Sequence, residues 1–329
     1  MKVTDAGSHK PVPRRDLLRH AGLAAAALAL RAPLAACQRE AGRAARTLEP
    51  AASLPPDPDG ARLAAWAAAL RTEGLARPET ALGPSAVRVG ELAAGTPYEA
   101  FSLEAYLRAG GSPLGTEPLT LSLTRFDCVT LVEACLAVAR VSDDRDPPTW
   151  ARFGAEVERM RYRDGERRGY ASRLHYFSEW IADGEKRGLV RDMGRELGGI
   201  EDARRLRFMT ENRRSYPALA DDAVYREIGA IERTLDGSPR RVVPTARLAE
   251  VADRIETGDV LAFATDVPGL DVSHSAFAYR DAEGMLRVLH APLSGGVVEV
   301  THATLPEYVA AIRRSTGVLV ARPLRTPGA

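Results

Sequence analysis

The chain has 329 residues, of which 45% are hydrophobic and 27% are charged. Its 45 Lys and Arg residues nearly balance its 44 Asp and Glu residues, so the formal net charge is +1. Binding to nucleic acid needs clustered positive charge that local pairing does not use, so nucleic acid is not an expected partner. The length is sufficient for one large hydrophobic core.

The first 37 residues are typical of an export signal. Arg14 and Arg15 precede an apolar run of ten residues, 21–30, and the sequence Leu-Ala-Ala-Cys, which ends at Cys37. So short a run cannot cross ~30 Å of hydrocarbon as a helix. The pattern resembles a twin-arginine signal with a bacterial lipobox, in which the cysteine is acylated. We expect lipidation of Cys37 and a lipid-anchored protein in the periplasm or cell envelope; a plain cleaved signal is the alternative. Removal of the signal takes away six Lys or Arg and two Asp or Glu, so no basic excess remains.

The sequence then predicts a tether and one domain. Residues 38–60 are rich in Ala, Arg, Pro and Asp without apolar periodicity, which is typical of a disordered tether. We place a single domain at 61–326. Helical apolar spacing marks its first half, at residues 61–75, 87–106 with a break at 95–98, 131–140, and 150–187.

The second half of the domain has a different pattern. Beyond Pro244, short β-rich runs are separated by Gly, Asp and Pro turn signals. The predicted strands are 258–264, 273–279, 286–290, 297–300 and 317–321, with a short helix at 305–313. Helices first and strands later, without βαβ alternation, favour an α+β fold with one antiparallel sheet. We expect the segment 150–245 to be a mostly helical insertion into this domain.

Cys128 is the candidate nucleophile among three cysteines. With Cys37 assigned to lipid, Cys128 and Cys135 remain, and two helical turns would separate them by ~10.5 Å, too far for a disulfide. Cys135 lies on a core-facing apolar stripe and is expected to be buried. Cys128 lies where an extended run meets a helix, and the N–H groups of a first turn favour a thiolate. The alternative for Cys128 is a buried structural thiol.

Two of the four histidines beyond the signal have the right placement for a base and its partner. A thiol hydrolase needs an imidazole base and a third polar group that orients it. His274 begins one predicted strand and His290 ends the next, so an antiparallel hairpin makes the two imidazoles neighbours. Cys128, His274 and His290 therefore form the candidate catalytic triad. Asp271 is an alternative orienting group.

Several segments carry a resemblance to a known family. They are Gly95–Tyr98, Phe126–Thr130 with Glu133, Ser172–Ile181, Gly258–Val260, Gly269–His274 and Leu289–Ala291. In order and spacing they resemble the NlpC/P60 cysteine peptidases, a papain-like superfamily, and more closely its N-acetylmuramoyl-L-alanine amidase-like (DUF1460) branch. The resemblance implies a papain-like NlpC/P60 core, with the nucleophile at a helix start packed on an antiparallel sheet. It also implies Cys128 as nucleophile, His274 as general base and acid, and His290 as orienting residue. Ala276 replaces a glycine usual in the superfamily and is expected to narrow the substrate groove.

The resemblance implies a peptidoglycan amide hydrolase with a Cys-His-His mechanism, and no cofactor or metal. The scissile bond, N-acetylmuramoyl–L-alanine or γ-D-glutamyl–diamino acid, stays open at this point. Expected partners are peptidoglycan or muropeptides and, through the lipid, a membrane; the protein is expected to be a monomer. One alternative is a zinc-dependent amidase with His175, His274 and His290 as ligands. Another is a non-catalytic lipoprotein that binds muropeptides.

Six further residues are candidates for substrate contact. Aromatic faces stack on sugars and arginine pairs with carboxylates. The candidates are Asp127, Arg173, Tyr176, Trp180, Asp271 and Ser273. Asp127 has the alternative role of N-cap for its own helix. For the aromatic candidates and Arg173 the alternative is packing within a helix, while His302 is expected on the surface.

Overall fold

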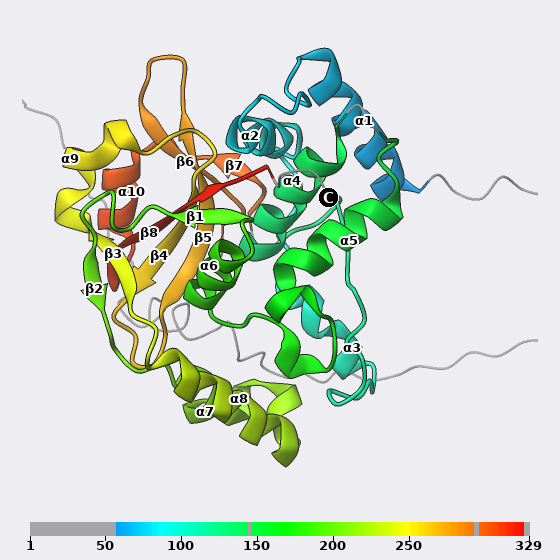
Figure 1. Cartoon of the computed structure of the whole chain (residues 1–329), viewed down its shortest axis with the longest axis vertical. Coiled ribbons are helices and arrows are strands. Elements are labelled where there is room, and N and C mark those ends of the chain that lie inside the picture. Colours follow the sequence, from blue (N-terminus) through cyan, green and yellow to red (C-terminus); the bar gives the residue numbers. More distant parts are fainter. Residues whose placement is uncertain (1–56, 144–145, 293–295, 326–329) are drawn as a thin grey trace, which may run out of the picture. The chain divides into compact units, whose positions relative to one another are not determined.

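The computed structural model describes residues 57–143, 146–292 and 296–325 (Figure 1). These residues belong to one compact unit, Pro55–Ala329. The expected signal, Cys37 and residues 38–56 of the expected tether lie outside the described residues. Within the described part, no helix is long and apolar enough to cross a membrane.

Helices occupy most of the first half of the unit, and the described helices include both long and short ones. The long ones are α1 (Pro58–Thr72), α2 (Leu82–Leu92), α4 (Cys128–Val141), α5 (Trp150–Arg161), α6 (Phe177–Lys186) and α8 (Asp222–Leu235). The short ones are α3 (Ala105–Arg108), α7 (Phe208–Glu211), α9 (Leu248–Val251) and α10 (Leu305–Ala311). Helix α1 begins inside the expected tether because Asp57 caps it, accepting from Asp59 N at 3.1 Å, and Pro58 suits a first helical position.

Eight strands form one antiparallel sheet in the order β2-β3-β8-β4-β5-β6-β7, with β1 also paired to β8. The strands are β1 (Val190–Asp192), β2 (Ile200–Asp202), β3 (Arg240–Pro244), β4 (Val260–Thr265), β5 (Val272–Arg280), β6 (Leu286–His290), β7 (Glu299–Val300) and β8 (Ser315–Pro323). The predicted α+β class and the antiparallel sheet are confirmed.

The expectation of a mostly helical insertion at 150–245 is incomplete. Three strands, β1, β2 and β3, lie in that segment and extend the sheet beyond β8. These strands are only three to five residues long, and each contains charged residues. They therefore lack the alternation of apolar and polar residues that predicts a strand from sequence. Helices α5 and α6 of the same segment contribute Phe153 and Trp180 to the main core.

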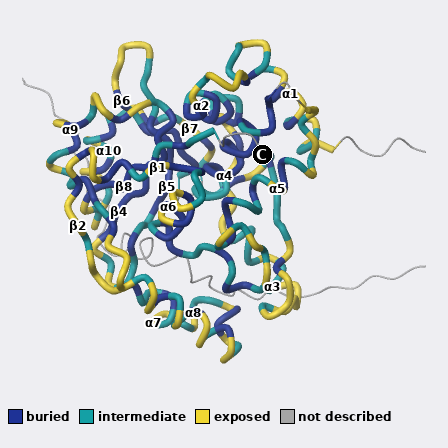
Figure 2. Tube along the Cα trace, viewed as in Figure 1, coloured by how far each residue is buried: buried dark blue, intermediate teal, exposed yellow. Residues whose placement is uncertain are grey.

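The sheet is covered on both faces, so its central strand β4 is buried along its whole length. Val260 and Ala262 of β4 face one core with α1, α2, α4, α5 and α6, and Leu261 and Phe263 face a second core with α9 and α10. Buried segments gather where the sheet meets α2 and α4 (Figure 2). This sandwich fixes α4 against β5 and thereby fixes the position of its first residue.

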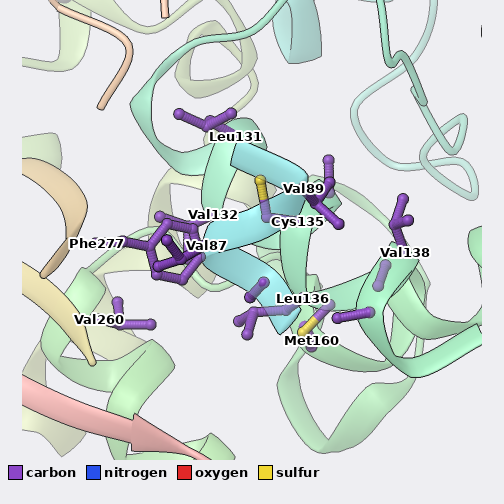
Figure 3. Close-up of a cluster of buried hydrophobic side chains, with 14 of the residues drawn as sticks. Val87, Val89, Leu131, Val132, Cys135, Leu136, Val138, Met160, Val260 and Phe277 are labelled. Carbon is purple, nitrogen blue, oxygen red and sulfur yellow. The ribbon is translucent and has the colours of Figure 1, made fainter. Parts of the chain in front are cut away.

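Helix α4 is the central helix of the first core. Its residues from Leu131 to Ala139 are all buried, and Cys135 is 0% exposed, which confirms the expected packing role of this cysteine. Val87 and Val89 of α2 and Phe277 of β5 surround it (Figure 3). Its one buried charge, Glu133, is paired with Arg161 of α5 at 2.8 Å, and the otherwise apolar surface is typical of a helix enclosed by other elements.

Candidate functional site

Asp127 sets the start of α4 and with it the position of Cys128. Its Oδ1 accepts from Thr130 N at 2.7 Å, while Thr130 Oγ1 accepts from Asp127 N at 2.8 Å. This reciprocal pair is a capping box, so the N-cap role of Asp127 is confirmed. Cys128 is the first helical residue, and it stays partly exposed although most of α4 is buried.

The two histidines of the β5–β6 hairpin are hydrogen-bonded, as the hairpin argument predicted. His274 Nε2 and His290 Nδ1 are 2.9 Å apart, and their rings meet edge to face at 76°. Both residues are buried, with 4% and 2% of their surface exposed. The His274 ring also stacks on Phe263 at 5.5 Å between ring centres, which holds its orientation.

The neighbours of this pair assign its tautomers. Glu299, which pairs with His290 across β6 and β7, has a carboxylate oxygen 3.7 Å from His290 Nε2, beyond hydrogen-bond distance, and this nitrogen has no hydrogen-bond partner among the described residues. A carboxylate favours a proton on the facing nitrogen, so we place the His290 proton on Nε2 and leave Nδ1 as acceptor. His274 then donates from Nε2, and its Nδ1, which has no hydrogen-bond partner among the described residues, keeps a free lone pair. This is the tautomer that a general base needs.

Burial keeps the imidazoles neutral. It lowers the pKa of His290 to about 4. For His274, burial first and the neighbouring His290 second lower the pKa to about 3. The hydroxyl of Tyr308 on α10 also lies 3.3 Å from His290 Nδ1.

Cys128 lies beside Ser275, the residue that follows His274 on β5. Burial, followed by the Asp127 carboxylate, raises the pKa of the Cys128 thiol to about 12, although the N–H and hydroxyl of Ser275 act in the opposite direction. The expected thiolate is therefore not the resting form. In the described residues no hydrogen bond joins Cys128 to His274. The His274 ring stacks on Phe263 of the second core, whereas Cys128 begins α4 of the first core. A direct contact between the two therefore has to form when substrate binds, as catalytic contacts commonly do.

Arg173 is buried and ion-paired, which favours the packing alternative over its expected role in substrate contact. It is 7% exposed and forms ion pairs with Glu104 at 2.6 Å and Glu117 at 3.2 Å. Its guanidinium also lies over the ring of Tyr170 at 4.9 Å. A buried cation with two carboxylate partners stabilises the segment around Glu104 and Glu117.

The aromatic candidates on and before α6 are packing residues as well. Tyr176 is 2% exposed; its hydroxyl donates to Glu232 at 2.7 Å and accepts from Met209 N at 3.2 Å. Trp180 is 4% exposed and stacks on Phe177 at 5.0 Å. Both aromatic side chains predicted to contact substrate lie in the hydrophobic cores. The sequence could not reveal this, because helix packing and ligand stacking use the same residue types.

Asp271 and Ser273 flank His274 on its N-terminal side and have different roles. Asp271 is 2% exposed and accepts from Ser178 N at 2.8 Å and from Val272 N at 2.7 Å, so it caps α6 from a distant loop. It is neither the group that orients His274 nor open to substrate. Ser273 is half-buried, as is Asp127, and these two are the predicted contact residues that remain near Cys128 and His274.

The remaining histidines and Ala276 lie apart from the candidate triad. His175 Nε2 is 3.0 Å from Tyr170 O, and burial holds the pKa of His175 well below its usual range. His302 is exposed, as expected. Ala276 is fully buried in the core beneath α10, so its methyl group does not narrow a groove. Among the described residues no three His, Cys, Asp or Glu side chains converge on a position for a metal ion, and the zinc ligands of the alternative do not form such a group.

Sequence reasoning missed four residues of this site: Tyr98, Ser275, Glu299 and Tyr308. Tyr98 forms a bridge with Phe126, two residues before Cys128, and burial followed by Cys128 raises the pKa of its phenol. Burial, then Cys128 and Glu299, raises the pKa of Tyr308 to about 12. Tyr98 carried a signal, because it ends the Gly-Thr-Pro-Tyr segment. The others depend on packing between distant elements and had none.

Comparison with known proteins gives an independent assignment. The family model described as AmiA-like, N-acetylmuramoyl-L-alanine amidase-like, matches residues 88–317. An N-acetylmuramoyl-L-alanine amidase from Bacteroides uniformis ATCC 8492 is 30% identical, with a TM-score of 0.67, over 74% of this chain and 98% of that one. A Bacteroides fragilis protein described as a candidate xylanase is 30% identical over 71% and 99% of the two chains, with a TM-score of 0.62.

A more distant structure shares the fold alone. It is a DUF1460 protein from Legionella pneumophila str. Philadelphia 1, 19% identical over 80% of this chain and 94% of that one, with a TM-score of 0.58. The curated proteins provide no match. The family match spans the candidate nucleophile, both hairpin histidines and most of the sheet. The chain therefore belongs to the N-acetylmuramoyl-L-alanine amidase-like family, a family of peptidoglycan-related amidase-like proteins.

Proposed function

We propose that this protein is a cysteine-dependent hydrolase of peptidoglycan that cuts the N-acetylmuramoyl–L-alanine amide. The observation that carries the proposal is the hydrogen-bonded His274–His290 pair, with a free Nδ1 on His274, on the strand whose next residue, Ser275, acts on Cys128. The family membership supports the amide as the bond class, and the name of the Bacteroides uniformis relative supports the muramoyl bond over the γ-D-glutamyl–diamino acid bond.

The reaction begins from a neutral thiol and a neutral imidazole. His274 Nδ1 takes the Cys128 proton as sulfur attacks the carbonyl carbon, and His290 stabilises the resulting imidazolium by accepting from Nε2–H. The N–H of Cys128 at the start of α4 and the phenol of Tyr98 are the proposed donors to the oxyanion. His274 then protonates the leaving amine, and water hydrolyses the muramoyl thioester with His274 again as base.

Two further parts of the proposal concern context. The core is proposed to be of the papain-like NlpC/P60 type, because the nucleophile begins a helix that packs on an antiparallel sheet carrying the base. Export through the twin-arginine route and lipidation at Cys37 remain a proposal from the signal sequence. A surface anchor on the envelope would keep the enzyme beside its substrate.

Muropeptide digestion tests the function directly. Purified protein incubated with disaccharide peptides should release intact stem peptide, which mass spectrometry detects, whereas release of shorter peptides would indicate the γ-D-glutamyl bond. Cys128→Ala should lower the rate of stem-peptide release by at least about 1,000-fold, because no nucleophile remains. Cys135→Ala, which removes a buried thiol from the same helix, is the matched control and should retain turnover.

Inhibitors separate the alternatives. Iodoacetamide should inactivate the protein and EDTA should not; the reverse pattern would favour the zinc-dependent amidase. Muropeptide binding without any turnover by the unmodified protein would favour the non-catalytic binding protein and reject the proposal.

A further inference from the structure

We propose that the hydroxyl of Ser275 is a catalytic group, which donates a hydrogen bond to the Cys128 sulfur as it becomes a thiolate. The inference deepens the proposed function and rests on it, since it takes Cys128 as the nucleophile. Neither the triad nor the matching sequence segments require a serine at this position.

Strand geometry directs Ser275 toward Cys128. Successive side chains of β5 alternate between the two faces of the sheet. Ala276 lies in the core under α10 and Phe277 in the core that contains α4, so Ser275 shares the α4 face with Phe277. Helix α4 packs on β5, and Cys128 is its first residue. The N–H and the hydroxyl of Ser275 both lie close enough to the sulfur to act on its ionisation.

The hydroxyl of Ser275 lacks any other use in the described structure. Ser275 is 1% exposed, and its Oγ makes no hydrogen bond among the described residues. A buried hydroxyl without a partner is costly, and a catalytic role is one physical reason for its retention. The O–H bond rotates freely, so it can turn to the sulfur when charge develops there.

The hydrogen bond from Ser275 is stronger to the thiolate that forms during the reaction than to the neutral thiol of the resting enzyme. Hydrogen bonds to ionised groups are stronger than those between neutral groups. The resting thiol is neutral, so Ser275 gains its full interaction only as the proton leaves for His274. Stabilisation confined to the charged form accelerates attack without tightening substrate binding.

Alkylation kinetics of the full chain test the proposal without any substrate. Iodoacetamide reacts with the thiolate, so its rate at Cys128, followed by mass spectrometry of the peptide that contains it, reports thiolate formation from about pH 6 to 10. Ser275→Ala should slow alkylation by about 3- to 10-fold at each pH below the thiol pKa, and Ser275→Thr should restore the rate. On muropeptides, kcat should fall in Ser275→Ala while KM stays unchanged.

The control is Ser142→Ala at the opposite end of α4. Ser142 is also fully buried, but its hydroxyl donates to Val138 O at 2.6 Å, so its loss should leave the alkylation profile unchanged. The proposal is overturned if Ser275→Ala alkylates at the wild-type rate, or if Ser275→Thr is as slow as Ser275→Ala, which would point to packing. If Ser275→Ala slows alkylation as expected but the wild-type protein releases no stem peptide, the proposed function is rejected and the role of Ser275 in thiolate formation is not.

Discussion

Cys128 begins a helix, yet its thiol is held in the protonated form. The sequence predicted a thiolate from the partial positive charge of a first helical turn, an effect worth about 0.3–1 kcal/mol at exposed sites. Burial and the adjacent Asp127 carboxylate oppose it and raise the pKa of Cys128 to about 12. Burial also lowers the pKa of His274. The resting site is therefore a neutral pair, and deprotonation accompanies attack in a general-base mechanism.

The buried imidazoles make stability depend on pH. Between its usual pKa of 6.5 and the folded value of about 4, His290 takes up a proton on unfolding but not in the folded protein. Its contribution to stability is therefore complete above about pH 6.5 and is lost as the pH falls toward 4. His290→Gln removes this uptake, so the stability of wild type relative to the variant should decline by about 1.4 kcal/mol per pH unit in that window.

Urea unfolding of both proteins at several pH values across the window measures this difference. His302→Gln, which removes an exposed imidazole, serves as the control. A stability difference between wild type and His290→Gln that does not change with pH would contradict the buried neutral state of His290.

At the scale of elements, the N-cap of α4 has two separable effects. Asp127 caps the helix through Oδ1, and its charge also raises the pKa of Cys128. Asp127→Asn keeps an acceptor for Thr130 N but removes the charge, so it should preserve stability and speed alkylation of Cys128. Asp127→Ala loses the cap as well and should lower the free energy of unfolding by about 1 kcal/mol.

Chemical denaturation and iodoacetamide kinetics on the same two variants provide the measurement. Equal alkylation rates in Asp127→Asn and wild type would show that the carboxylate does not act on the sulfur.

Element boundaries were predictable where local signals were strong. Strand β6 was predicted with its observed ends, and α10, β4 and β5 within a few residues, because apolar runs there are bounded by turn residues. Strands β1, β2 and β3 were not predicted, since pairing with a distant strand stabilises them rather than their own pattern. Helix patterns likewise could not distinguish substrate contact from packing at Tyr176 and Trp180.

At the scale of the whole molecule, two glycines allow α2 to dock beside the sheet. Gly258, just before β4, has φ +90°, and a Cβ on it would lie 2.1 Å from the backbone of Gly83 in the first turn of α2. Gly258→Ala should therefore destabilise the protein by about 3 kcal/mol or more, from backbone strain and overpacking together. Thermal or urea unfolding measures the loss.

Gly284→Ala isolates the backbone contribution. Gly284 has φ +80° but open space around its Cβ position, so its substitution should cost only about 1–2 kcal/mol. Equal losses in the two variants would mean that the approach of α2 to β4 tolerates a methyl group.

Part of the candidate site was predictable because it depends on residue type and local strand pairing. The rest depends on contacts between distant elements and was not. Cys128 with the two hairpin histidines followed from residue type, spacing and strand pairing, and the histidine contact exists in the structure. Ser275, Glu299 and Tyr308 acquire their positions from contacts between α4, β5, β7 and α10. These elements are far apart in the sequence, and no local residue pattern predicts that they meet.

The protonated state of Cys128 also has a consequence for durability. Thiolates attack peroxides and disulfides far faster than thiols do, so a sulfur with a pKa of about 12 reacts slowly with them while the site is empty. If Cys128 is the nucleophile, as proposed, it would thus be preserved between turnovers. The same high pKa that slows alkylation by iodoacetamide protects the sulfur from oxidative damage.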